Sequence, residues 1–217
     1  MIFRTSTFGR VFAFQCLEAV KLKKNYRIPA FLVAACLLFS SVVFASGKLT
    51  ADTLLKETIL LPVGSHAVYA GGVTAIYFCE RSVTPYIKSD RTYVPLRFVS
   101  EKMGAAVSWD GQTQTALVSN GQHSIEITVG MMHYLLDGVR KPLDAPAELI
   151  PSSEGYARTM VPLRFIAEGL QYQVAWDSEN RVAVVTGNSH QWDPNGTTEK
   201  QVIQKGLLQI EMYKMFI

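Results

Sequence analysis

The sequence predicts an α+β fold built from two related units. Its strongest feature is an internal repeat: Arg91–Glu101 reads RTYVPLRFVSE, and Arg158–Glu168 reads RTMVPLRFIAE, 67 positions later (91 to 158). Each copy continues with helix-like spacing of apolar residues and then with two strand-like stretches around a turn. With 217 residues, 48% of them hydrophobic, the chain is long and apolar enough to bury a sizeable core.

A short helix is predicted after each Val-Pro pair. The prolines favour an extended residue before them, at Val94 and Val161, and Pro95 and Pro162 suit the first helical position, where a missing N–H costs nothing. Gly104 suits the end of the first helix. One face of each helix is apolar at i, i+3 and i+7, and it consists of Leu96, Val99 and Met103 in the first copy and Leu163, Ile166 and Leu170 in the second.

Two strands joined by a turn follow each helix. They are predicted at residues 106–109 and 113–118 around Asp110-Gly111, and at residues 172–176 and 181–185 around residues 177–180. At the same offset, Val107-Ser108-Trp109-Asp110 corresponds to Val174-Ala175-Trp176-Asp177.

The stretch between the copies predicts further strands. Ile125, Ile127 and Val129 alternate with polar residues, and Asp137-Gly138 is a hairpin turn leading to a strand at residues 141–143. Gly72-Val73 resembles Gly138-Val139 with a slip of one residue, so the part before the first copy is a degraded match. The predicted units are therefore residues 62–120 and 121–187.

Residues 1–45 are predicted to be a secretory leader. A basic stretch from Lys21 is followed by an apolar run and by Val43-x-Ala45, so cleavage is expected after Ala45. An uncleaved anchor over Ile28–Ala45 and a lipidated Cys36 are the competing interpretations. Residues 1–19 fit no part of a signal peptide, which suggests a true start at Val20.

Charge and cysteine content exclude several functional classes. Six of the 21 Lys and Arg residues and one of the 18 Asp and Glu residues precede Ser46, so 15 bases and 17 acids follow, a net charge of −2. No clustered basic surface for nucleic acid is therefore expected. Only Cys79 lies beyond the leader, where it is expected to be a buried small hydrophobic residue, and a disulfide within one mature chain is excluded.

The doubled motif resembles the copper amine oxidase N-terminal domain family, also called the stalk domain. The residues that match are Val94, Pro95, Leu96, Arg97, Phe98, Trp109 and Asp110, with Val161, Pro162, Leu163, Arg164, Phe165, Trp176 and Asp177 in the second copy. The resemblance covers about residues 65–187. It implies twisted antiparallel sheets each packed on a short helix, in a tandem module of secreted bacterial surface proteins.

The resemblance does not imply oxidase activity. An amine oxidase needs three histidines for copper and an Asn-Tyr-Asp/Glu sequence for its quinone. His66, His123, His133 and His190 contain no His-x-His pair, and the Asn-Tyr sequence, Asn25-Tyr26, lies in the leader. No catalytic residue, metal site or cofactor is predicted.

Several repeated residues allow both a structural and a binding role. Arg97 and Arg164 are expected to pair with Glu101 and Glu168 at i, i+4, or with Asp110 and Asp177, rather than to bind a ligand. Alternation with Val107 and Val174 predicts that Trp109 and Trp176 are buried; the alternative is a sugar-stacking role. Weaker candidates for ligand contacts are Tyr86, Tyr93, Tyr134, Tyr156 and Tyr172, and the four histidines are expected to be solvated loop residues.

The tail, residues 188–217, predicts a turn at Asp193–Gly196 and then a helix. Thr198 with Gln201 fits a capping box, and Ile203, Leu207 and Ile210 form an apolar stripe. Either this helix docks on the second unit or it opens a further domain that is cut short.

Together these features predict a non-catalytic, secreted cell-surface or cell-wall-associated binding or spacer module. Its expected partners are a cell-wall glycan or another surface protein, with membrane contact only through an uncleaved leader. The alternative is an accessory domain of a wall-active enzyme, such as a hydrolase, whose catalytic part is on another chain or missing.

Overall fold

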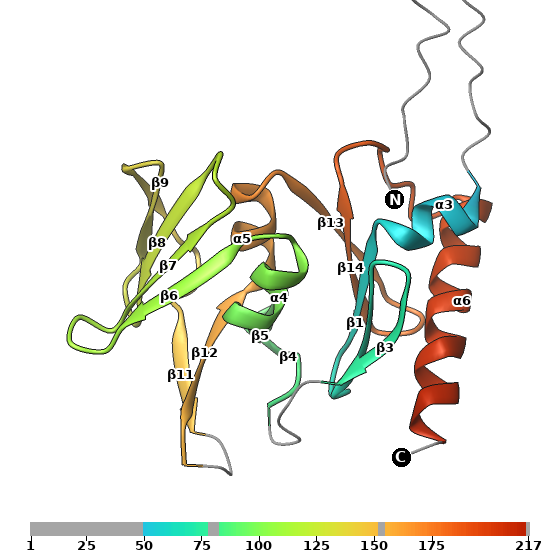
Figure 1. The fold of residues 1–217 in the computed structure, drawn as a ribbon, viewed down its shortest axis with the longest axis horizontal. Helices are drawn as coiled ribbons and strands as arrows, with labels where there is room; N and C mark the ends of the chain where they lie inside the picture. The colour runs from blue at the N-terminus through green and yellow to red at the C-terminus, as the bar shows by residue number, and fades with distance from the viewer. Residues whose placement is uncertain (1–49, 78–82, 152–154, 216–217) are drawn as a thin grey trace, which may run out of the picture. The chain divides into compact units, whose positions relative to one another are not determined.

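A computed structural model describes residues 50–77, 83–151 and 155–215, all within one compact unit, Lys48–Ile217 (Figure 1). This unit is a mixed α/β structure of antiparallel sheets and a few helices. The predicted leader with its cleavage site at Ala45, and Cys79, lie outside the described residues. Among the helices in the described part of the chain, none is long and apolar enough to cross a membrane.

Strands β1 to β14 form three sheets. The first sheet has the order β13 (Tyr172–Asp177), β14 (Val182–Gly187), β1 (Thr58–Pro62), β2 (Ala67–Ala70), β3 (Val73–Tyr77). The second sheet has the order β10 (Val139–Pro142), β9 (His133–Leu136), β8 (Ser124–Thr128), β7 (Thr115–Ser119), β6 (Ala106–Asp110). The four-stranded sheet has the order β11 (Glu148–Pro151), β12 (Ala157–Pro162), β5 (Arg91–Pro95), β4 (Tyr86–Lys88).

The segments that contain the sequence repeat form the same elements in the same order. The first copy forms β5, α4 (Leu96–Lys102), β6 and β7, and the second forms β12, α5 (Leu163–Gly169), β13 and β14. The strands upstream also correspond, but with an offset of 66: β1 begins at Thr58 and β8 at Ser124, and β2 begins at Ala67 and β9 at His133. The one-residue slip noted at Gly72 therefore extends over β1, β2 and β3, whereas β4 and β11 begin 62 positions apart, at Tyr86 and Glu148.

Each five-stranded sheet combines strands from both copies. β14 pairs with β1 over five residues, and β7 pairs with β8 over five residues. The predicted boundary between residues 120 and 121 lies in the turn between the paired strands β7 and β8. The predicted start at residue 62 also misses α3 (Ala51–Lys56) and most of β1, because the upstream part lacks the Val-Pro motif that marks the repeat.

The two Val-Pro motifs meet each other in the four-stranded sheet. Val94 lies opposite Val161, and the flanking pairs are Tyr93 with Pro162 and Pro95 with Met160. Because an offset of 67 exchanges the two strands of this ladder, the equivalent residues Val94 and Val161 face each other at its centre, and the two flanking pairs correspond to each other. Both valines are fully buried.

The helices α4 and α5 cover the main core with the faces that the sequence predicts. Leu96, Val99 and Met103 are each at most 3% exposed, as are Leu163, Ile166 and Leu170. Pro95 and Pro162 are N-cap residues rather than the first helical residues, because their ψ values of 115° and 122° are still extended. Gly104 ends α4 at φ +78°, and the equivalent Gln171 takes φ +66° without glycine's freedom.

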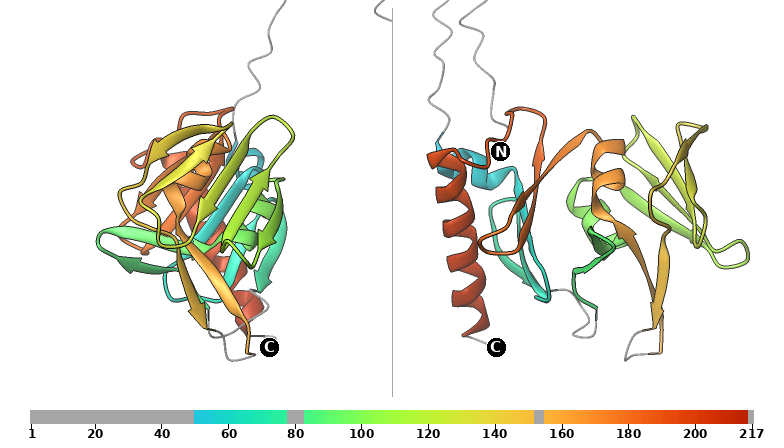
Figure 2. Two further views of the ribbon diagram at one scale, coloured as in Figure 1. Left: turned by 90° about the vertical axis from the view of Figure 1, so that its left-hand side faces the viewer. Right: turned by 180° about the vertical axis from the view of Figure 1, so that it is seen from behind.

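Helix α6 (Thr197–Lys214) packs with α3 on the outer face of the first sheet (Figure 2). Ile203 and Ile210 are buried there and Leu207 is partly buried, so the predicted stripe faces a core that also contains Trp192. The predicted capping box is wrong: Gly196 is the N-cap and no side chain caps it, because Thr198 already lies inside the first turn.

The start of α6 contains a buried carboxylate, Glu199, only 5% exposed and 2.7 Å from His190 Nε2. Burial alone would raise its pKa, but the hydrogen bond from His190 and backbone hydrogen bonds at Glu199 and Asp193 outweigh burial and lower it. A lowered native pKa stabilises the fold above about pH 5, and this contribution disappears as the pH falls through the native pKa.

We therefore expect Glu199→Gln to lower the free energy of unfolding by about 1–2 kcal/mol at pH 7. The difference from the wild type should shrink between pH 5 and 3, as measured by urea unfolding at each pH. Glu211→Gln is the control, because Glu211 is an exposed residue of the last turn. A difference that stays constant down to pH 3 would contradict the role of this carboxylate.

Candidate functional site

The two repeated tryptophans are exposed, contrary to the sequence prediction. Trp109 on β6 and Trp176 on β13 are each 39% exposed. They do lie on the core side of their sheets, since Val107 and Val174, two residues earlier, pack against the main core. Both indoles remain partly exposed, although Ala116 and Ala183, the residues opposite them, belong to that core. The same exposure in both copies makes it a property of the repeated unit.

Small residues lie opposite both indoles. Trp109 pairs with Ala116 on β7, and Trp176 pairs with Ala183 on β14. An alanine in the cross-strand position leaves room for a large ring above the neighbouring strand. Each tryptophan ring thus has room to lie over the neighbouring strand, while its other side stays accessible.

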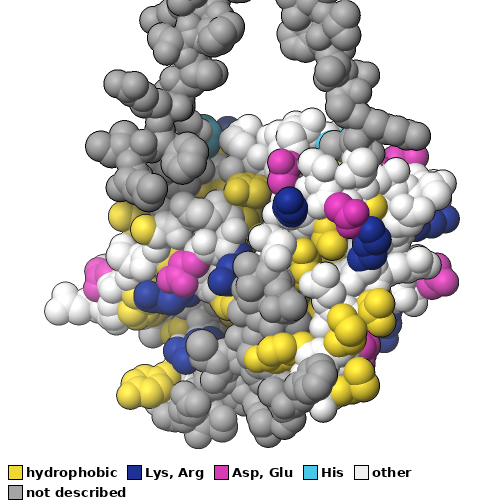
Figure 3. Space-filling model, turned by 45° about the vertical axis from the view of Figure 1, so that its right-hand side comes forward, with side chains coloured by type: hydrophobic (Ala, Val, Ile, Leu, Met, Phe, Trp, Pro, Cys, Tyr) yellow, Lys and Arg dark blue, Asp and Glu magenta, His cyan; other side chains and the backbone are white. Residues whose placement is uncertain are grey.

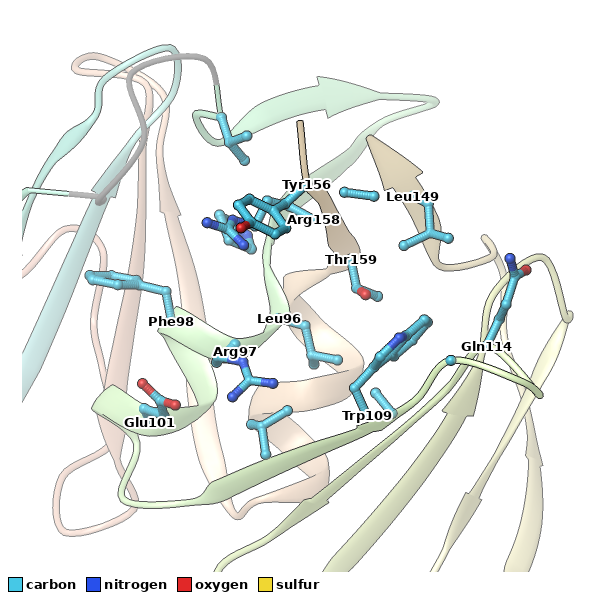
Figure 4. A pocket seen from close by; sticks show the side chains of 16 residues that line it. Leu96, Arg97, Phe98, Glu101, Trp109, Gln114, Leu149, Tyr156, Arg158 and Thr159 are labelled. Atoms are coloured by element: carbon cyan, nitrogen blue, oxygen red, sulfur yellow. The ribbon is translucent and has the colours of Figure 1, made fainter. Parts of the chain in front are cut away.

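Trp109 lies in an open groove of about 630 Å³, which we call groove 1 (Figure 4). Helix α4 lines it with Leu96, Arg97, Phe98 and Glu101, and β12 of the other copy contributes Arg158 and Thr159. In Figure 4 the Arg97 side chain extends between Glu101 and Trp109, and Tyr156 lies beside Arg158. Tyr156 is 68% exposed.

Trp176 lies in an equivalent groove of about 640 Å³, groove 2. Its lining repeats that of groove 1 at the offset of 67, with Leu163, Arg164, Phe165 and Glu168 in place of the four residues on α4. Arg91 and Thr92 from β5 take the places of Arg158 and Thr159. The pairing of β5 with β12 therefore places part of each copy in the groove of the other.

The repeated aspartates close turns and do not pair with the arginines. Asp110 accepts hydrogen bonds from Gln112 N at 2.9 Å and Thr113 Oγ1 at 2.7 Å, and these bonds lower its pKa. Asp177 accepts from Glu179 N at 3.1 Å and from Asn180 Nδ2 at 2.7 Å. The Trp-Asp pair thus combines a groove residue with a turn residue.

The repeated arginines differ between the copies. Arg164 Nε lies 3.9 Å from Glu168 Oε1, as predicted, but both side chains are more than 60% exposed, so this ion pair adds little stability. No carboxylate among the described residues lies within 4 Å of a guanidinium nitrogen of Arg97.

The other candidates are mostly structural. Tyr93 is buried and donates to the Pro146 carbonyl at 3.0 Å, and Tyr86 stacks on it with ring centroids 5.1 Å apart. Tyr172 donates to the Met103 carbonyl at 3.0 Å, and Tyr134 packs on Phe165. Of the five tyrosines, Tyr156 is the one that is exposed in a groove.

The histidines are not simply solvated loop residues. His123 Nδ1 lies 2.8 Å from Asp137 Oδ2, His133 lies on β9 beside Arg140, and His190 contacts Glu199. In residues 50–77, 83–151 and 155–215, no group of three or more His, Cys, Asp or Glu side chains is placed to hold a metal ion.

Comparison with known proteins identifies the family. Neither the curated proteins nor the solved structures gave a match. The family model for the copper amine oxidase N-terminal domain matches residues 74–186, just over half of the chain, in a single match that spans both copies of the motif. This is a family of non-catalytic domains. The chain therefore belongs to the copper amine oxidase N-terminal domain family.

Proposed function

We propose that the chain is a non-catalytic module of two related halves, exported to the bacterial cell surface, where it binds the cell wall. The observation that supports binding over a passive spacer is the pair of grooves, each with an exposed tryptophan at the same position of the repeat. A spacer needs no exposed tryptophan. Each exposed indole also lacks the stabilisation that full burial of the ring would give.

The charge distribution argues against nucleic acid as the ligand. The residues after Ala45 have a net charge of −2, which supplies no excess of cations for phosphates. The face shown in Figure 3 interleaves Lys and Arg with Asp and Glu, and its hydrophobic side chains form small separate groups.

A sedimentation assay with isolated cell-wall sacculi tests this proposal. Residues 48–217, which form one compact unit, are mixed with sacculi or with insoluble cellulose and then centrifuged. We expect retention on the sacculi and none on cellulose. The double variant Trp109→Ala/Trp176→Ala should lose retention, whereas Trp192→Phe should keep it, because Trp192 is 9% exposed and packs under α6. Recovery of the wild type in the supernatant with both materials would overturn wall binding.

A further inference from the structure

We propose that groove 1, and not groove 2, binds the carboxylate-bearing sugars of an acidic glycan, with Trp109 as the stacking surface and Arg97 as the carboxylate partner. This inference rests on the proposed binding function and assigns it to one of two grooves that the repeat makes nearly equal.

The first difference is charge. The described residues that line groove 1 include Arg97, Arg158 and Glu101, two bases and one acid. Groove 2 includes Arg91, Arg164, Asp90, Asp144 and Glu168, two bases and three acids. The formal charges of these described residues are therefore +1 and −1, which makes groove 1 the more favourable of the two for an anion.

The second difference is that Arg164, the counterpart of Arg97, lies within ion-pair distance of an acid, whereas Arg97, among the described residues, does not. Arg91 Nη2 lies 2.6 Å from Asp144 Oδ2 and its Nη1 donates to the Asp90 carbonyl at 3.2 Å, while Arg164 lies near Glu168. Arg97 has no acidic partner within ion-pair distance in the described part of the chain. Its fork of N–H donors matches a carboxylate and faces the groove in Figure 4.

The shape of groove 1 fits a sugar ring better than an apolar ligand. The exposed indole offers a flat face for the C–H groups of a pyranose. A Cβ added at Gly111 would lie 3.7 Å from the indole Nε1, so the glycine leaves space beside this edge of the ring. Gln114 and Thr159 line the same space and offer donors and acceptors for hydroxyl groups.

The test uses a soluble tetrasaccharide of alternating N-acetylglucosamine and N-acetylmuramic acid with free lactyl carboxylates, and its methyl ester. Calorimetry with residues 48–217 should show binding of the acid and about tenfold weaker binding of the ester. Trp109→Ala should weaken binding of the acid at least about tenfold. Arg97→Gln should bind acid and ester equally. Its side chain is exposed, so the variant should fold normally.

Groove 2 supplies matched controls, Trp176→Ala and Arg164→Gln, which should bind the acid like the wild type. Equal losses in both grooves, or discrimination that survives Arg97→Gln, would overturn the assignment. Binding of a poly-glutamate peptide with equal affinity would overturn the glycan as the ligand. Retention on sacculi without tetrasaccharide binding would refute only the assignment of glycan binding to groove 1. Tetrasaccharide binding without retention would refute only the proposed wall association.

Discussion

Residues 50–120, expressed without the rest of the chain, should show no cooperative unfolding as a monomer, and residues 121–215 should behave in the same way. Each fragment retains one complete copy of the motif, but β7 then lacks β8, and β1 lacks β14. The main core also contains residues of both copies, such as Val99 and Ile166. Fragments that bury only part of their core cannot offset the entropy of folding.

Mixing the two fragments should restore the fold. Circular dichroism and light scattering should report a one-to-one complex with the β-sheet content of the intact chain. A nick at Asn120-Gly121 in the intact protein is the control, because it cuts the turn before β8 and removes no element. A fragment that unfolds cooperatively as a monomer would show that a copy can fold without the strands that the other copy adds to its sheet.

Local patterns were enough to predict the elements of each copy. The helix faces at Leu96 and Leu163 follow from spacing within two turns, and the Asp137-Gly138 hairpin follows from two residues that tolerate positive φ, which both adopt. These signals lie within a few residues of each other. They can therefore be detected without knowledge of the fold.

The partners of the strands could not be predicted in this way. Alternation identifies the inner face of β7 but does not say whether β8 or β1 lies beside it. Whether each sheet combines strands from both copies depends on that choice. The upstream strands were further obscured by the one-residue slip and by the absence of a Val-Pro pair.

The sequence favoured structural roles for the main residues of the candidate site, and it did not predict their arrangement. A binding role was only the alternative for Arg97 and Trp109, and Tyr156 was a weak candidate. Alternation predicts the face of the strand on which Trp109 lies, but its exposure of 39% depends on tertiary packing. Thr159 and Gln114 carried no sequence signal for a groove. They enter groove 1 through the pairing of β5 with β12 and through the turn after β6.

The largest effect of a single substitution is expected at Leu60 on β1. This residue is fully buried under α6 in a cluster with Leu55, Tyr69 and Val184. Leu60→Ala should lower the free energy of unfolding by about 3–5 kcal/mol, because it removes apolar burial and leaves a cavity between two rigid elements. Urea unfolding followed by circular dichroism measures this change.

The second sheet provides the matched comparison, because α6 covers only the first sheet in the described structure. Leu117 on β7 corresponds to Val184 on β14, yet it is 40% exposed. Leu117→Ala should therefore cost less than about 1 kcal/mol. Gly206→Leu approaches the same contact from the helix, since a Cβ at Gly206 would overlap Leu60 Cδ1, and it should destabilise the fold by about 1–3 kcal/mol. Similar decreases in the free energy of unfolding for Leu60→Ala and Leu117→Ala would mean that α6 does not cover the first sheet in solution.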